Sequence, residues 1–474
     1  MDNNYKLNSS FTINGYINLN WKNKTTFTST QYYPAQLKER YGKEDENGWI
    51  NKIFWGDNLQ VMSHLLKEYR GKIKLIYIDP PFDSKADYKR KIKLKGKEIK
   101  NDINSFEEKQ YTDIWSNDEY LQFMYERLIL MRELLSDDGS IYLHCDWHQS
   151  HYLRCILEQV FGVNNFRNEI IWHYRRWTAE SNDFQKMHDN ILVFSKSNNY
   201  IFNPIYIETT EGQKKKHEKG WDRNSVQIEG RMQPQLIVYD EDKVNAAIKD
   251  GRINKNEFAR IVKVDIKQTI ASDVWSMNLL NSQSKERTGY PTQKPENLIE
   301  QIILSSSNLD DIVFDCFMGS GTTQNVALKL GRKFVGTDIN LGSIETTVKR
   351  LINNSEYKGI DVYYMDNSKY LKESATSKID VNEHMIKINE FYPTYLLQNL
   401  KLRKEDIEDW RELVDSIMID FDYDGTVLKP TVIDIPNRNE LVKGEYEIPK
   451  DANIIKVKII DVSYKIYEFK LEIK

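Results

Sequence analysis

The sequence predicts an α/β protein built around a mostly parallel sheet, and three observations support this fold class. From Trp49 onward, short apolar segments of strand length alternate with longer amphipathic segments, which is the pattern of repeated β–α units. Several of the apolar segments end at a glycine or an aspartate, as at Gly56, Asp79 and Asp338. The alternation stops near residue 197 and resumes beyond residue 272, so two separated parts of the chain are expected to build one sheet.

Each element is predicted from its own pattern. Short, mostly apolar segments of four to six residues indicate strands, and apolar residues recurring every three or four positions indicate helices. In the first part, the predicted elements are a strand at 50–55, a helix at 59–69, a strand at 73–78, a helix at 120–135, a strand at 140–145 and a helix at 149–161. In the second part, they are a helix at 297–306, a strand at 312–316, a helix at 323–330 and a strand at 334–337.

The remaining segments define the expected domain organisation. The first residues mix Asn, Thr, Tyr and Lys without periodicity, and residues 197–272 lack a clean pattern and indicate an inserted module. Near the C-terminus, one expected helix at 404–414 precedes alternating apolar and polar residues that indicate strands. The expected parts are an N-terminal arm (1–48), a first α/β half (49–196), the insert (197–272), a second α/β half (273–374) and a small, mostly β accessory domain (375–474).

Composition excludes several classes of protein. With 474 residues, 40% of them hydrophobic and 29% charged, the chain is long and apolar enough to fold around a substantial core. The 3 cysteines do not form a cluster with metal-ligand spacing, so no metal site is expected and a reducing cytoplasm is the expected location. No uncharged apolar run approaches the roughly 18 residues of a spanning helix, and the first residues lack the pattern of a secretion signal, so no membrane association is expected.

Two prolines directly follow the buried strand that ends at Asp79. Pro80 and Pro81 fix the backbone there and leave carbonyl groups that cannot continue a strand ladder. A carboxylate and a rigid carbonyl together can accept both hydrogens of an exocyclic amine, which makes its nitrogen nucleophilic, and the ring of Phe82 can stack on the base that bears this amine. Asp79, Pro80, Pro81 and Phe82 are therefore candidate catalytic residues, although an ordinary turn with a solvated Asp79 explains the tetrapeptide equally well.

A glycine-rich turn joins the predicted strand at 312–316 to the next helix, and it allows a ligand to approach the backbone beside a helix N-terminus. Asp338, which ends the next strand, stands where an acid commonly accepts the ribose hydroxyls of an adenosine-containing cofactor. A phosphate-binding loop is disfavoured because Thr322 stands where its lysine is expected, and a nicotinamide-binding loop is disfavoured because the GxGxxG spacing is missing. A plain strand-to-helix connection remains open.

Together these motifs resemble one known family over roughly residues 49–350: the amino-group DNA methyltransferases that use S-adenosylmethionine, in the circularly permuted arrangement called the β class. The fold that this implies is a Rossmann-like methyltransferase sheet with an inserted target-recognition module. Six motifs carry the resemblance in the family's order: Gly56-Asp57-Asn58-Leu59, Asp79-Pro80-Pro81-Phe82, the segment 139–146, Asp273-Val274-Trp275, Pro291-Thr292-Gln293-Lys294-Pro295 and the segment 315–323.

The resemblance implies a role for each motif. Asp79 and the Pro80 carbonyl hold the target amine, and Phe82 stacks on the flipped base, which is an adenine or cytosine of duplex DNA. The strands carrying Asp79 and Asp315 are expected to lie side by side. The implied cofactor-binding residues are Asp57 at the adenine amine, Gln293, Lys294 and Pro295 closing the methionine end, Asp315 near the methionine ammonium, Phe317, Gly319, Gly321 and Thr322 along the methionine side, and Asp338 on the ribose.

Basic residues gather in two runs despite a net charge of −4. Residues 83–100 hold eight Lys or Arg against three acids, and a second run lies at 214–223 inside the insert. A loop beside a base pocket must lie against phosphates, so both runs are expected to contact DNA, with a solvated hairpin as the alternative. The expected contacts are Lys85, Lys89, Arg90, Lys91, Lys93, Lys214, Lys215, Lys216 and Arg223.

For several other polar residues and for the exact activity, the sequence supports more than one interpretation. Arg175 and Arg176 fit phosphate contacts or surface ion pairs equally well, and His144, His148 and His151 are interpreted as structural. In the family, Asp-Pro-Pro accompanies adenine N6 and Ser-Pro-Pro accompanies cytosine N4, so a site-specific adenine-N6 methyltransferase is favoured, with cytosine N4 as the alternative. The chain resembles type III modification subunits, so a restriction partner, a solitary methylase, a homodimer and a catalytically silent DNA-binding subunit all remain open.

Overall fold

The computed structural model describes residues 4–6, 19–81, 87–94, 105–112, 117–176, 182–207, 211–264, 269–281, 283–290, 292–365, 374–437 and 440–472. The chain divides into two compact units. The first contains Met1–Phe202 and Asp273–Lys474, and the second contains Asn203–Ser272. Among the described helices, none combines the length and the apolar character that crossing a membrane requires.

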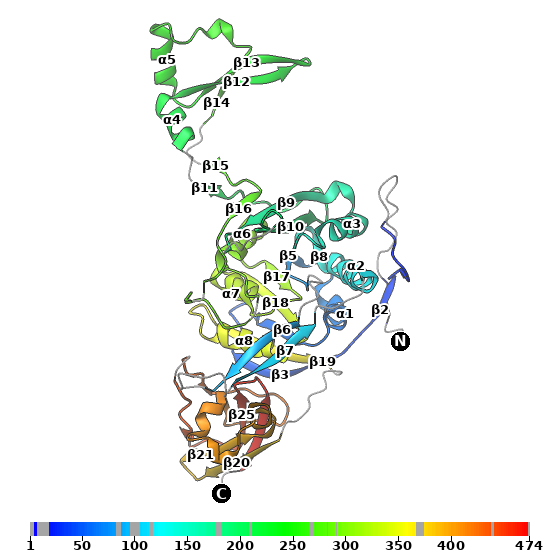
Figure 1. Cartoon of the computed structure of the whole chain (residues 1–474), viewed down its shortest axis with the longest axis vertical. Helices are drawn as coiled ribbons and strands as arrows, with labels where there is room; N and C mark the ends of the chain where they lie inside the picture. Colours follow the sequence, from blue (N-terminus) through cyan, green and yellow to red (C-terminus); the bar gives the residue numbers. More distant parts are fainter. Residues whose placement is uncertain are drawn as a thin grey trace. The chain divides into compact units, whose positions relative to one another are not determined.

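A single sheet organises the first unit and confirms the predicted α/β class (Figure 1). Its interior strands pair in parallel, and its edge strands include antiparallel pairs. Among the described residues, ten strands form it in the order β16 (Val274–Ser276), β9 (Phe166–His173), β10 (His188–Ser195), β8 (Leu135–Cys145), β5 (Ile73–Ile78), β17 (Ile312–Asp315), β18 (Lys333–Asp338), β4 (Asn51–Trp55), β19 (Gly359–Met365) and β3 (Ala35–Gly42).

Helices cover both faces of this sheet, because its central strands are apolar on both sides. In β5, Ile76 and Ile78 pack into one core, whereas Leu75 and Tyr77 pack into the other, as the two-residue period of a strand requires. Each buried aliphatic side chain of this kind contributes roughly 1.5–3 kcal/mol. Figure 1 shows α1 (Asn58–Tyr69), α2 (Asn117–Leu134) and α3 (Ser150–Phe161) on one side, and α6 (Glu296–Ser306), α7 (Thr322–Lys329) and α8 (Leu341–Ile352) on the other.

Part of the expected N-terminal arm belongs to the sheet. Ala35–Gly42 form the edge strand β3, which pairs antiparallel with β19. The segment was expected to be irregular because its sequence lacks sustained periodicity, but its buried residues include Glu39 and Tyr41, and Glu39 is neutralised by Lys458 from a distant part of the chain. Two short strands precede it, β1 (Asn4–Lys6) and β2 (Ser29–Gln31), and they pair with each other.

The C-terminal part is mostly β, as predicted, but the expected helix at 404–414 is wrong. Two short 3₁₀ turns, Lys404–Asp406 and Trp410–Leu413, occupy this segment, and the side chain of Asp409 starts the second turn by accepting from the Arg411 amide. The α-helix lies earlier, at α9 (Thr394–Leu400). One sheet contains β20 (Ala375–Val381), β21 (Met385–Pro393) and β24 (Glu445–Glu447), and a second contains β23 (Val432–Asp434), β22 (Val414–Asp420), β25 (Ile454–Asp461) and β26 (Ile466–Glu472).

A buried charge cluster joins this C-terminal part to the main sheet. The ammonium of Lys458 lies 2.8 Å from each carboxylate oxygen of Glu39 and 2.9 Å from Oε1 of Glu345 on α8. Burial alone lowers the pKa of Lys458, but the charges of Glu345 and Glu39 outweigh burial and raise this pKa above its ordinary value. The lysine is 1% exposed, so its charge depends on the two glutamates for neutralisation.

The second unit has regular elements that the irregular sequence pattern did not predict. Strands β12 (Trp221–Ile228) and β13 (Arg231–Val238) form a hairpin, and β14 (Arg260–Lys263) pairs in parallel with β13. A small core that includes Trp221, Leu236 and Val244 holds these strands to α5 (Glu241–Lys249). The unit also contains α4 (Glu211–Lys219) and the strand pair β11 (Tyr206–Ile207) and β15 (Thr269–Ile270).

Candidate functional site

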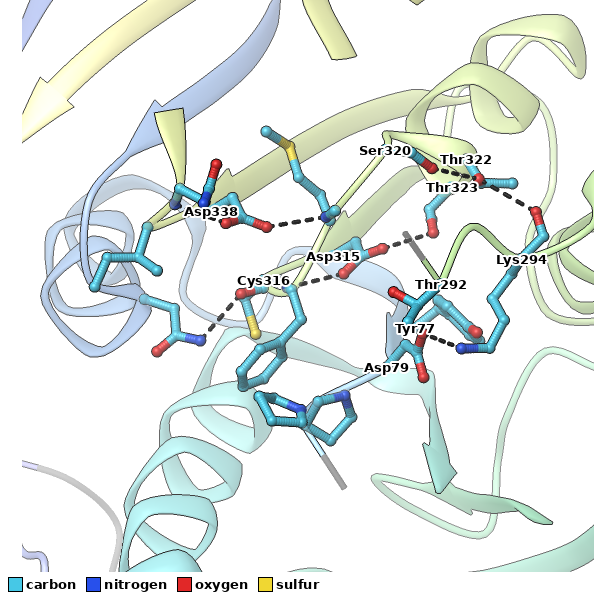
Figure 2. Close-up of a pocket in the computed structure, with 18 of the residues that line it drawn as sticks. Tyr77, Asp79, Thr292, Lys294, Asp315, Cys316, Ser320, Thr322, Thr323 and Asp338 are labelled. Atoms are coloured by element: carbon cyan, nitrogen blue, oxygen red, sulfur yellow. Dashed lines mark hydrogen bonds and ion pairs between the residues drawn. The ribbon is translucent and has the colours of Figure 1, made fainter. Parts of the chain in front are cut away.

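Four acids meet at one edge of the main sheet. Asp79 follows β5, Asp315 ends β17, Asp338 ends β18 and Asp57 follows β4, and these four strands are parallel neighbours. The strands carrying Asp79 and Asp315 lie side by side, as predicted, although they come from the two separated parts of the chain. Ligands in open α/β sheets bind where such strands end. A cavity of about 370 Å³ opens here, and all four acids line it (Figure 2).

The turn after β17 is shaped by Asp315. Its Oδ1 accepts from the Phe317 amide at 2.9 Å, and its Oδ2 accepts from Oγ1 of Thr323 at 2.6 Å. Next to it, the amide of Gly319 donates to Oδ2 of Asp338 at 3.0 Å, which ties the turn to the end of β18. Gly319 has a φ of 50°, in the left-handed region that favours glycine.

Burial makes two of these acids weak. Burial raises the pKa of Asp315 to about 7, and the charges of Asp79 and Asp338 act in the same direction. Burial likewise raises the pKa of Asp338 to about 6, against the hydrogen bonds that its carboxylate accepts, first among them the one from the Asn340 amide. A cationic ligand stabilises ionised carboxylates, so this end of the cavity favours a positively charged group.

Asp79 is held by one oxygen and leaves the other one unused. The ammonium of Lys294 contacts its Oδ2, and the two side chains are only 13% and 19% exposed. Oδ1 of Asp79 is buried and has no hydrogen-bond partner among the residues that the structure describes. An unpaired buried acceptor is costly, so this atom is poised to accept a hydrogen bond from a bound molecule. Figure 2 shows Lys294 directed at Asp79 across the cavity.

Asp57, which was predicted to contact the cofactor, also stabilises the local structure. Its Oδ1 accepts from the amides of Leu59 and Gln60 and thereby caps α1, and its Oδ2 accepts from Arg127 at 2.9 Å. Arg127 is 7% exposed and also donates to Asn58, whose amide group in turn donates to the carbonyl of Cys316. The sequence analysis missed Arg127, because a single arginine inside a helix carries no local signal.

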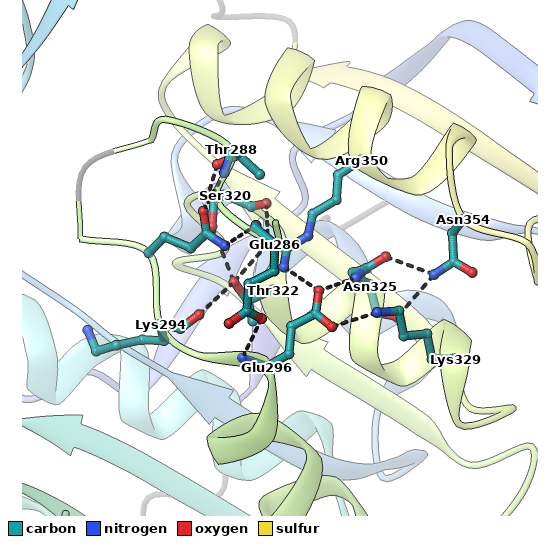
Figure 3. Close-up of polar contacts among 11 residues, drawn as sticks. Glu286, Thr288, Lys294, Glu296, Ser320, Thr322, Asn325, Lys329, Arg350 and Asn354 are labelled. Atoms are coloured by element: carbon teal, nitrogen blue, oxygen red, sulfur yellow. Dashed lines mark hydrogen bonds and ion pairs between the residues drawn. The ribbon is translucent and has the colours of Figure 1, made fainter. Parts of the chain in front are cut away.

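A second polar network fixes the segment that contains Lys294 (Figure 3). Oε1 of Glu296 accepts from Arg350 at 2.7 Å, and the same arginine donates to Oγ1 of Thr322 at 2.9 Å and to the carbonyl of Ser320 at 3.2 Å. Gln293 bonds within its own loop, because its Oε1 accepts from the amide and the hydroxyl of Thr288. The network joins the start of α6 to the glycine-rich turn and to α8. Neither Arg350 nor Glu296 was predicted.

Most of the predicted catalytic and cofactor-binding residues that the structure describes line the cavity, and two do not. Gly321 packs behind the turn, where a Cβ would come within 2.5 Å of Thr347 on α8, so its missing side chain serves packing. Pro295 is the N-cap of α6 and lies outside the cavity lining. Phe82 lies outside the described residues. The predicted residues in the lining are Asp57, Asp79, Pro80, Pro81, Gln293, Lys294, Asp315, Phe317, Gly319, Thr322 and Asp338.

The predicted DNA contacts occur in two separate elements. The contacts predicted in the run at 83–100 lie on β6 (Asp87–Lys93), which forms a hairpin with β7 (Ser105–Thr112). The exception is Lys85, which lies outside the described residues. The second group belongs to the second unit, where Lys216 pairs with Asp222 at 2.6 Å and Arg223 donates to the carbonyl of Arg252. On β6 lie Lys89, Arg90, Lys91 and Lys93; Lys214 and Lys215 are exposed on α4.

Comparison with known proteins identifies the family. A family model described as a DNA methylase, of the N6 and N4 type, matches residues 73–349. The chain belongs to this family. The predicted class, an amino-group DNA methyltransferase, is therefore confirmed, and so is S-adenosylmethionine as the methyl donor of this DNA methylase.

Relatives with known names agree with this assignment. The methylase is 30% identical over 338 residues to the type II methyltransferase M.EcaI of Enterobacter cloacae, covering 65% of this chain and 71% of that protein. It is 25% identical to the DNA adenine methyltransferase YhdJ of Escherichia coli, over 72% of this chain and 95% of that protein. It is also 25% identical to the probable type III HindVI Mod subunit of Haemophilus influenzae, and the match covers 69% of this chain but only 54% of that subunit.

Proposed function

We propose that this DNA methylase transfers a methyl group from S-adenosylmethionine to the exocyclic N6 of an adenine that is flipped out of duplex DNA. The single observation that supports this most directly is the unpaired, buried Oδ1 of Asp79, a residue that lines the same cavity as the turn after β17. An acceptor for an amine and a pocket for a charged cofactor are thereby placed in one cavity.

The residues of the cavity fit the cofactor. S-adenosylmethionine supplies a methyl group that is already activated on a sulfonium, and its methionine part also carries an ammonium. Asp315 and Asp338 are acids that burial makes reluctant to ionise, so they gain from a cation nearby. Tyr290 lines the cavity beside Gly319, where the absent side chain keeps the backbone open to a ligand.

The chain's own part in the reaction is to orient the amine and to exclude water. Oδ1 of Asp79 accepts one hydrogen of the amine, and the carbonyl of Pro80, held by the proline ring that follows, accepts the other. Lys294 holds Oδ2 and so fixes the carboxylate with Oδ1 directed at the amine. Apolar side chains of Pro81 and Phe123 line the same cavity and remove competing water. The stacking role of Phe82 remains a prediction.

Adenine is preferred over cytosine for two reasons. First, Pro80 and Pro81 follow an aspartate, Asp79. In this family, an aspartate before the two prolines accompanies adenine N6. Among the relatives, YhdJ is named a DNA adenine methyltransferase, and it is matched over nearly its whole length. We accordingly propose the adenine-specific activity, with methylation of cytosine N4 as the outcome that would correct it.

The biological setting is proposed only in outline. The names of the relatives belong to restriction–modification systems of types II and III, and we propose that this chain acts in such a system or as a solitary methylase, in the cytoplasm. The matches cover between 30% and 62% of the length of these type III Mod subunits, so a restriction partner is not implied by their names. Dimerisation also remains a prediction, and sedimentation velocity would measure it.

The test is the transfer of labelled methyl groups from S-adenosylmethionine to mixed-sequence duplex DNA, followed by digestion to nucleosides. We expect the label in N6-methyl-2′-deoxyadenosine, and we expect Asp79→Ala to abolish transfer while the cofactor still binds. Label in N4-methylcytosine would overturn the choice of base. Unchanged turnover in Asp79→Ala would overturn the role of this carboxylate.

A further inference from the structure

Two connections open at the same sheet edge as Asp79, on the side away from the glycine-rich turn after β17: the one that follows β8 and the one that joins β9 to β10. β8 is the parallel neighbour of β5, with Ile78 paired to Leu143, so the residues after Cys145 follow the same edge. β10 is antiparallel to both β8 and β9, and its first residue, His188, pairs with the last residue of β9, His173. The segments after β8, after β9 and before β10 therefore lie beside one another next to the cavity.

Exposed aromatic and basic side chains gather on these three segments. Trp147 is 39% exposed and stacks on His148 with ring centroids 3.5 Å apart, and the ammonium of Lys186 lies 4.3 Å from the Trp147 ring. Arg175 and Arg176 are exposed at the end of β9. We call these five residues the aromatic–basic strip. Asp146, the acid that follows β8, is engaged by the amide and the ring of His148.

A buried polar chain ties the strip to the cavity. The hydroxyl of Tyr77, which lines the cavity, lies 2.9 Å from Nδ1 of His144, whose Nε2 lies 3.2 Å from Asp189. The other oxygen of Asp189 accepts from the hydroxyl of Tyr174 at 2.9 Å, and Arg176 donates to this same hydroxyl at 3.1 Å. These hydrogen bonds cross β5, β8 and β10 and end at Arg176 in the strip. They therefore hold the strip in a fixed place relative to the cavity that Asp79 lines.

We propose that the aromatic–basic strip binds the DNA strand next to the flipped adenine, an inference that rests on the proposed function. The guanidinium groups of Arg175 and Arg176 and the ammonium of Lys186 contact phosphates, since cations beside the pocket release counterions from the backbone. When the target base leaves the helix, the adjacent base loses its stacking partner, and Trp147 stacks on this adjacent base. An exposed indole that packs against a second ring and a cation can stack on any base.

The phosphate contacts are tested by the salt dependence of DNA binding. Fluorescence anisotropy with a labelled duplex, in the presence of S-adenosylhomocysteine, gives the dissociation constant across a salt series for the full chain. In Arg175→Ala/Arg176→Ala/Lys186→Ala, we expect the slope of log K against log salt to become shallower by about 2.7, or about 0.9 for each lost phosphate contact. The control is Lys378→Ala/Lys387→Ala/Arg403→Ala, which removes three exposed cations of the C-terminal part. An unchanged slope in the first variant, or an equal change in the control, would overturn the proposal.

The stacking contact is tested separately by two substitutions of Trp147. Alanine should weaken duplex binding by roughly tenfold to a hundredfold, whereas Trp147→Phe, which keeps an aromatic face, should retain most of the affinity. The dissociation constant for the cofactor should be unchanged in both, which also shows that the variants are folded. Equal losses in Trp147→Ala and Trp147→Phe, or no loss in either, would remove Trp147 from the DNA contact.

These experiments distinguish a failure of the proposed DNA contact at the strip from a failure of the proposed methyltransferase activity. If the wild-type chain binds duplex DNA without transferring methyl groups, the proposed function fails, and the salt slope still decides whether the strip is the contact. If methyl transfer proceeds and the triple variant keeps the wild-type slope, the strip alone fails. If the wild-type chain binds no duplex at all, both proposals are overturned.

Discussion

Cofactor affinity should depend on pH, because one of the buried acids at the cavity titrates near neutrality. Burial raises the pKa of Asp315 to about 7. If only the ionised carboxylate engages the ammonium of the cofactor, about 90% of the sites are competent at pH 8 and about 9% at pH 6, so the dissociation constant should rise about tenfold between these values. Asp338, whose pKa is raised to about 6, adds a further factor of about two at pH 6.

Isothermal titration calorimetry of S-adenosylhomocysteine, which keeps the ammonium but lacks the sulfonium, measures this effect without turnover. In buffers of different ionisation enthalpy, binding at pH 6 should release about 1.4 protons, about 0.9 from Asp315 and about 0.5 from Asp338, and binding at pH 8 about 0.1. Asp315→Asn should weaken binding at pH 8 and flatten the pH dependence, whereas Asp310→Asn, at a side chain that is 70% exposed, should behave like the wild type. A dissociation constant that is constant from pH 6 to pH 8 would refute the reasoning.

The raised pKa of Asp315 also affects the free energy of unfolding. Its contribution should increase as the pH falls, whereas cofactor affinity should decrease. The folded-state pKa of Asp315 lies above its ordinary value of 3.8, so the folded chain binds more protons than the unfolded chain between about pH 4 and pH 7. The contribution of Asp315 to the free energy of unfolding should therefore increase as the pH falls through 7. Urea titrations of the ligand-free protein should show this increase, and Asp315→Asn should reduce it.

Three further substitutions test other parts of the structure. Lys458→Met leaves two glutamates buried without their cation and should lower the free energy of unfolding by about 3–5 kcal/mol, which urea denaturation measures. Asp338→Ala should weaken cofactor binding at least severalfold at pH 8, and an unaltered dissociation constant would remove Asp338 from the site. Lys294→Met should lower kcat for methyl transfer while the cofactor still binds, because Asp79 loses the contact that orients it, and Lys294→Arg should recover part of the rate.

The central strands could be predicted from the sequence because each is determined by its own residues. Ile73–Ile78 is apolar at every position except Lys74, and β5 occupies these residues, because a parallel strand covered on both faces is predominantly apolar. The edge strand β3 could not be predicted in this way. Its buried residue Glu39 is compatible with a core only because Lys458, 419 positions later, neutralises it. No local pattern contains that pairing.

The same distinction separates the predicted site residues from those that were missed. Acids at strand ends and a glycine-rich turn are local signals, and they located Asp79 and Asp315. Arg127 and Arg350 act through partners in distant segments, namely Asp57 and Thr322, so only the fold reveals them. Lys294 was predicted to close over the cofactor, and the structure adds its contact with Asp79, the acid that we propose holds the target amine.

The arrangement of charges links the ligand-free fold to catalysis. Burial raises the pKa of Asp315, and the charge of the nearby Asp79 acts in the same direction. Among the described residues that line the cavity, Lys294 is the one with a cationic side chain, and it contacts Asp79. A cofactor that brings an ammonium and a sulfonium therefore favours the ionised form of Asp315, so that cofactor affinity and the protonation of this buried acid are coupled.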